Sequence, residues 1–101
     1  MTIEKYVENE ATVFALSGWL DTKTAPELAA ELSGLDAGIK SLIFDLGELE
    51  YISSAGLRQL VAAHKMVSGN LVLRNVRPEV LDVLRMAGFD RRLHIEACEE
   101  K

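Results

Sequence analysis

A nearly continuous apolar run, SLIFDL at residues 41–46, constrains the fold of this chain more than any other feature. Runs of this length and composition are typical of strands that are buried on both faces of a sheet. An amphipathic helix is predicted to follow over residues 54–68, and another apolar strand over residues 70–76. A strand, a helix and a strand in this order form a right-handed parallel crossover, so we expect residues 41–46 to be a central strand of an α/β sheet.

The segments on either side continue this alternation. Residues 2–9 and 12–18 are predicted to be two strands joined by a short turn, and therefore an antiparallel hairpin. Trp19 follows this hairpin and breaks its alternation near an edge; packing in the core or at its rim is favoured, and exposure is the alternative. The remaining predicted elements are helices over residues 25–34 and 78–87 and a last strand over residues 93–97. The order β-β-α-β-α-β-α-β predicts a mixed sheet, with the helices packed mainly on one face.

The composition fits one acidic domain. The 101 residues are 49% hydrophobic, which suits a single domain over residues 1–101. The net charge of −5 disfavours nucleic acid and anionic membranes as partners, because both attract clustered Lys and Arg. No apolar stretch approaches the ~20 residues that span a bilayer, and no basic leader precedes an apolar run. We therefore expect no membrane insertion and a cytoplasmic location.

The chain lacks the motifs of common enzyme classes. It has no G-x-S-x-G elbow, no Walker loop and no G-x-G-x-x-G fingerprint. His64 lies about three helical turns beyond Ser54 and is expected to be packed, so Ser54 has no evident catalytic base. His64, His94 and the single cysteine, Cys98, do not have metal-ligand spacing. We expect no enzymatic activity, no metal and no cofactor.

Two adjacent serines, Ser53 and Ser54, stand where the helix over residues 54–68 is predicted to begin. Serine is a preferred N-cap residue, because its hydroxyl accepts a hydrogen bond from a free backbone N–H. With Ser53 as the cap, Ile52 and Leu57 are placed for a hydrophobic staple. We therefore predict that Ser53 caps the helix and that Ser54 is its first residue.

This assignment leaves the hydroxyl of Ser54 free for another role. Ser54 shares a helical face with Arg58 and is expected near the surface. A phosphate on Ser54 would be tolerated at the positive end of the helix, where Arg58 would neutralise part of its charge. On spacing alone, a plain helix start and a modification site both remain open. The inward stripe of this helix is predicted to comprise Leu57, Leu60, Val61, His64 and Val67.

Three segments together resemble the STAS family, which includes the anti-sigma factor antagonists. The segment LIFDLGELEYISSAGLRQLVAAHK is similar to the family's buried strand ending in Asp, its short apolar loop and its serine-rich turn before Gly-Leu at a helix start. LSGWLDTKTAPEL resembles the family's Leu-x-Gly-x-Leu-Asp segment, and LRMAGFDRRLHI resembles its closing helix and final strand. The resemblance covers nearly the whole chain and implies the STAS fold.

The resemblance also implies a partner-switching mechanism. The unphosphorylated antagonist binds an anti-sigma factor that is also a serine kinase, and this releases the sigma factor. The kinase phosphorylates a serine at the start of the second helix, the complex dissociates, and a PP2C-type phosphatase resets the antagonist. That serine corresponds to Ser54 here, and the matching glycine is Gly56. Ser53 stands where many members of the family carry Asp.

A surface around Ser54 is implied as the site that binds the partner. Asp45 is expected near Ser54, where it would hold the loop over residues 47–53 or assist phosphoryl transfer; hydrogen bonding within that loop is the alternative. Asp45 and Gly56 are thus expected to support the site. For Asp21, a turn-forming role is the alternative to partner binding. The implied partner-binding residues are Asp21, Thr22, Lys23, Ser53, Ser54, Ala55, Arg58 and Ala62.

A second function remains open, because one fold serves several functions. The same domain would suit a non-switching STAS subunit, for example in a lipid-transport complex, or a module that binds a small ligand. The feature that separates these alternatives from the antagonist is an exposed, phosphorylatable Ser54.

Overall fold

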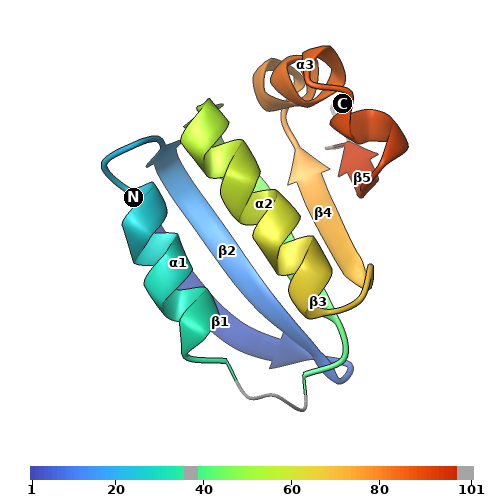
Figure 1. Cartoon of the computed structure of the whole chain (residues 1–101). Helices are drawn as coiled ribbons and strands as arrows, with labels where there is room; N and C mark the ends of the chain where they lie inside the picture. Colours follow the sequence, from blue (N-terminus) through green and yellow to red (C-terminus); the bar gives the residue numbers. More distant parts are fainter. Residues whose placement is uncertain (36–38, 98–101) are drawn as a thin grey trace.

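Five strands form one mixed sheet in the order β1-β2-β3-β4-β5 (Figure 1). The structure is a computed structural model, and it describes residues 1–35 and 39–97. Cys98 lies outside the described residues. The elements in chain order are β1 (Thr2–Glu8), β2 (Ala11–Leu20), α1 (Ala25–Ser33), β3 (Leu42–Ile52), α2 (Ser54–Met66), β4 (Leu71–Val76), α3 (Pro78–Met86), the 3-10 helix η1 (Phe89–Arg91) and β5 (His94–Ala97).

The topology follows from one hairpin and a series of crossovers. β1 and β2 are antiparallel, whereas β2, β3, β4 and β5 are mutually parallel. The hairpin turn consists of Asn9 and Glu10, which both have positive φ angles, of 48° and 70°. Turns of this kind match the twist of the flanking strands. β3 is the central strand, so the predicted place of residues 41–46 and the mixed sheet are confirmed.

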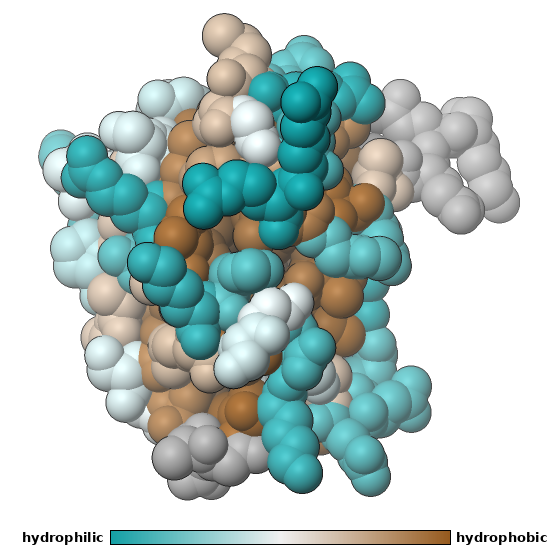
Figure 2. Space-filling view, turned by 45° about the vertical axis from the view of Figure 1, so that its right-hand side comes forward, coloured by the Kyte–Doolittle hydropathy of each residue, from teal (hydrophilic) through white to brown (hydrophobic). Residues whose placement is uncertain are grey.

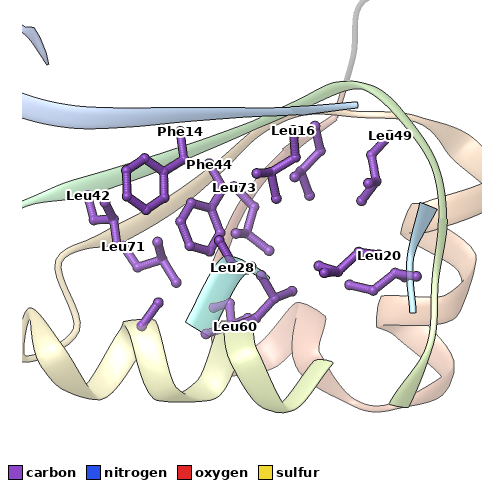
Figure 3. Packing of buried hydrophobic residues seen from close by; sticks show 14 of the residues in the cluster. Phe14, Leu16, Leu20, Leu28, Leu42, Phe44, Leu49, Leu60, Leu71 and Leu73 are labelled. Carbon is purple, nitrogen blue, oxygen red and sulfur yellow. The ribbon is translucent and has the colours of Figure 1, made fainter. Parts of the chain in front are cut away.

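The hydrophobic core lies between the sheet and the helices. α1 and α2 lie side by side across the same face of the sheet (Figure 1). Phe14 and Phe44 stack in the middle of the core, with ring centroids 5.8 Å apart, and Leu28 and Leu60 point toward them from the helices (Figure 3). Burying one such side chain contributes about 1.5–3 kcal/mol. The helices are therefore held on one face by the apolar side of each strand, as predicted.

β3 is longer than predicted, because bulges continue it to Ile52. From Asp45 to Glu48 the strand advances by three residues while β2 advances by two, from Ala15 to Ser17. A second register shift follows between Gly18 and Trp19. Extra residues of this kind re-aim the side chains that follow them. The predicted loop over residues 47–53 is thus mostly strand. From Leu46 onward the buried side chains of β3 recur every three residues instead of every two, at Leu46, Leu49 and Ile52.

The inward side of α2 differs from the predicted stripe. Gly56, Leu60 and Ala63 are buried in the helix, and Val67 is buried directly after it. Leu57, Val61 and His64 are only partly buried. The helix therefore faces the sheet with its small residues, which allow a close approach, and leaves part of its apolar surface beside η1.

The other face of the sheet is crossed by one long side chain. Arg74 on β4 reaches Glu8 on β1, with Nη1 2.6 Å from Oε2, and also lies 3.3 Å from the Tyr6 hydroxyl. The hydrogen bond to Glu8 raises the pKa of Arg74 and so favours its charged form. Val13 on β2 is fully buried although its side chain lies on this face, opposite to that of its neighbour Phe14.

None of the helices in the described residues has the length and apolar character needed to cross a bilayer.

Candidate functional site

Ser53 and Ser54 have different roles at the start of α2. Ser53 has an extended backbone, with φ −101° and ψ 177°, and its Oγ accepts a hydrogen bond from the Gly56 N–H at 3.4 Å. Ser53 is therefore the N-cap, as predicted. Ser54 is the first residue of the helix, and its side chain is exposed. The hydroxyl of Ser54 makes no hydrogen bond with the rest of the described chain.

The cap assignment predicts different costs for two alanine variants. Ser53→Ala should lower the free energy of unfolding by about 1 kcal/mol, because the Gly56 N–H loses its acceptor. Ser54→Ala should cost less, since alanine is the better helix former and no hydrogen bond is lost. Chemical denaturation of both variants checks this, and the reverse order of stability would contradict the cap.

Gly56 allows the start of α2 to lie directly against the end of β2. A Cβ at position 56 would come within 2.8 Å of side-chain atoms of Ile52 and Leu20, and within 2.9 Å of the Leu20 carbonyl oxygen. That same oxygen accepts a hydrogen bond from the Ser53 N–H at 2.9 Å. The contact brings Ser54 close to the turn that follows β2.

The turn after β2 is built around Asp21. Its Oδ1 accepts hydrogen bonds from the backbone N–H groups of Lys23, at 3.0 Å, and Thr24, at 3.1 Å. The Thr24 hydroxyl accepts from the Asp21 N–H at 2.8 Å and donates to the Trp19 carbonyl oxygen, also at 2.8 Å. The bond from the Thr24 backbone is the main cause of a lowered pKa at Asp21, so this carboxylate is ionised at neutral pH.

The structure brings most of the predicted partner-binding residues to one end of the domain. The Asp21 turn and the first turn of α2 meet at the carboxyl ends of β2 and β3 (Figure 1). Thr22 and Lys23 are exposed in the turn. Along α2, Arg58 and Ala62 are exposed and Ala55 is partly buried.

A groove runs along α2 from Ser54 toward the far end of the helix. It has a volume of about 480 Å³. We call it the α2 groove, and it is lined by Ser54, Leu57, Arg58, Val61, Ala62, Lys65 and Phe89. Phe89 belongs to η1, so the groove exists because the chain after α3 folds back beside α2.

Comparison with known proteins agrees with this architecture. The sequence matches the STAS domain over residues 2–101. The chain belongs to the STAS domain family. BtrV of Bordetella bronchiseptica, provisionally named an anti-sigma factor antagonist, is 40% identical over 81 residues, which cover 76% of this STAS domain and 70% of BtrV.

Solved structures share the STAS fold at lower identity. An anti-sigma factor antagonist from Mycobacterium paratuberculosis matches with a TM-score of 0.85 at 22% identity, over 94% of this chain and 84% of that one. The antagonist SpoIIAA in its unphosphorylated form matches with a TM-score of 0.73 at 19% identity, over 93% of this chain and 86% of that one. The predicted STAS fold is confirmed.

Asp45 does not lie beside Ser54 in this STAS domain. Its neighbours along β3, Phe44 and Leu46, point into the core, so Asp45 points to the face of the sheet without helices. There its Oδ1 accepts from the Gly47 N–H at 3.0 Å, and its Oδ2 lies 3.5 Å from Nη2 of Arg74. The expected placement next to Ser54 was wrong because β3 continues past residue 46, whereas the alternative of local hydrogen bonding describes Asp45 correctly.

An exposed aromatic pair was missed at the same end of the domain. Trp19 and Tyr51 face each other across β2 and β3, with ring centroids 5.1 Å apart, and remain 56% and 43% exposed. Packing was favoured over exposure for Trp19, and this was wrong: Phe14, Leu16 and Leu20 of β2 face the core, so regular alternation directs Trp19 outward, beside the Asp21 turn. Exposed aromatic side chains are enriched in protein interfaces. Tyr51 was missed because residues 47–53 were predicted to be a loop, whereas β3 continues through them and pairs Tyr51 with Trp19.

Proposed function

We propose that this STAS domain is an anti-sigma factor antagonist that works by partner switching. In its unphosphorylated form it binds an anti-sigma factor that is also a serine kinase, and binding releases a sigma factor. Phosphorylation of Ser54 by that kinase ends the interaction, and a PP2C-type phosphatase restores it. The domain is a substrate of both enzymes and is not itself an enzyme, and the exchange takes place in the cytoplasm.

The state of Ser54 is the observation that carries this proposal. Its side chain is exposed, and its hydroxyl is not needed for the cap, which Ser53 provides. A kinase can therefore approach the hydroxyl without unfolding the helix. The phosphate would then lie at the N-terminus of α2, where free N–H groups and the helix dipole favour negative charge by about 0.3–1 kcal/mol.

The surroundings of Ser54 support a protein partner. The Asp21 turn, the exposed part of α2 and the Trp19–Tyr51 pair lie at one end of the domain, and together they offer charged, apolar and aromatic contacts. The relationship to BtrV supports the antagonist role. SpoIIAA has been solved in phosphorylated form as well as unphosphorylated, so a protein of this fold accommodates the modification.

The proposal is tested with the purified anti-sigma factor of the same organism, bound to its sigma factor. Adding this domain should displace the sigma factor, and incubation with the anti-sigma factor and ATP should add the mass of one phosphate. Peptide mapping should locate that phosphate on Ser54, and the modified domain should no longer displace sigma. A phosphate on Ser53 or Thr22, or no displacement by the unmodified domain, contradicts the proposal.

A further inference from the structure

The α2 groove combines an apolar floor with cationic edges. Leu57, Val61 and Phe89 are partly buried and form the floor, and Ala62 is exposed along one side. On the side of the molecule seen in Figure 2, hydrophobic residues are visible between hydrophilic side chains. From Ser54 to Lys65 the helix rises about 17 Å, at about 1.5 Å per residue, which equals three turns of a second helix.

The charge along this groove is opposite to that of the whole domain. The chain has a net charge of −5, yet α2 contains no acidic residue. Arg58 and Lys65 line the groove, and neither forms an ion pair within the described residues. A small hollow beside it, which shares Val61 and Phe89, adds Arg92. No carboxylate belongs to either lining.

We propose that the α2 groove binds an acidic amphipathic helix of the anti-sigma factor. The apolar stripe of that helix packs on Leu57, Val61 and Phe89, and its carboxylates meet Arg58 and Lys65. An amphipathic helix in an apolar groove is a common mode of recognition, with anchors spaced three and four residues apart. The inference rests on the proposed function and adds the chemistry of the partner segment.

This arrangement gives the switch a direct electrostatic cause. Ser54 lies at one end of the groove, and Arg58 follows it by one helical turn. A phosphate on Ser54 brings about −1.5 to −2 charges to the place where the acidic helix docks. It also attracts the guanidinium of Arg58, which the carboxylates of the partner then lose. Repulsion and competition for one cation act in the same direction, toward release.

Charge reversal at Lys65 tests the proposal without altering Ser54 or its cap. Lys65→Glu should weaken binding of the purified anti-sigma factor about tenfold or more, mostly through slower association, and should make the affinity less dependent on salt. Lys5→Glu on β1 is the matched control, because it makes the same charge change on an exposed residue at the far edge of the sheet. Its affinity should stay within about twofold of the wild type.

A photo-crosslinking side chain at position 65 identifies the occupant. The captured peptide should come from the anti-sigma factor, be predicted helical, and carry several Asp or Glu residues beside an apolar stripe. A basic or neutral peptide, or a second copy of this domain, would overturn the inference. The same holds if Lys65→Glu binds as tightly as the wild type while Ser54→Asp does not. Absence of binding by the wild type itself would instead reject the proposed function on which the inference rests.

Discussion

Ser54→Asp should bind the anti-sigma factor about a hundredfold more weakly than the wild type, while it unfolds at a similar temperature. The helix tolerates the new carboxylate because it lies at the N-terminus of α2, next to free N–H groups. The interface does not, because burying an extra charge against a partner costs several kcal/mol unless that partner supplies a cation. At about 1.4 kcal/mol for each tenfold change, a loss of ~3 kcal/mol gives the hundredfold effect.

Two further variants separate the position of the charge from its mere presence. Ser33→Asp adds the same charge at the last residue of α1, where the side chain is exposed and lies outside the α2 groove. Its affinity should remain close to that of the wild type. Ser54→Ala should bind normally and should not release when kinase and ATP are added. Titration calorimetry and thermal melts measure both properties, and equal affinities of the wild type and Ser54→Asp would rule out the switch at this position.

Gly56→Ala should destabilise the domain by about 2 kcal/mol or more, because a single methyl group has no space there. Its Cβ would meet Ile52 and Leu20 at 2.8 Å and the Leu20 carbonyl oxygen at 2.9 Å. Backbone cannot move aside as a flexible side chain can. The loss exceeds the gain of about 1 kcal/mol that alanine brings over glycine within a helix. For a domain of this size, the melting temperature should fall by roughly 10 °C.

Gly34→Ala is the matched control for this effect. Gly34 ends α1 with a φ angle of −85°, and a Cβ there would lie 3.6 Å or more from its nearest neighbours. The free energy of unfolding should therefore change by less than about 0.5 kcal/mol. If Gly56→Ala proved as stable as Gly34→Ala, the close approach of α2 to β2 would be wrong, and with it the placement of Ser54 beside the Asp21 turn.

Local patterns in the sequence were enough to predict the elements and their order. The apolar run at residues 41–46 predicted a central strand, and this was confirmed. Burial on both faces was not: Leu42, Phe44 and Leu46 are buried, whereas the residues between them face the side without helices and are only partly buried. The serine pair predicted the start of α2, and the Ile52–Leu57 pair predicted which serine caps it. These features depend on residues within one or two turns of each other, so the sequence alone contains the necessary information.

Only the tertiary structure decided the features that depend on how distant segments pair with each other. Two bulges in β3, where it pairs with β2, carry the strand on to Ile52. They turn Leu49 into the core and pair Tyr51 with Trp19 on the exposed face. A period of two residues predicts the facing of a regular strand, but a single inserted residue reverses it, and no local pattern marks the insertion. The α2 groove likewise needs Phe89 from η1 beside a helix more than twenty residues earlier in the chain. The sequence by itself determined the fold and the serine at the start of α2, whereas packing between distant elements decided what surrounds that serine.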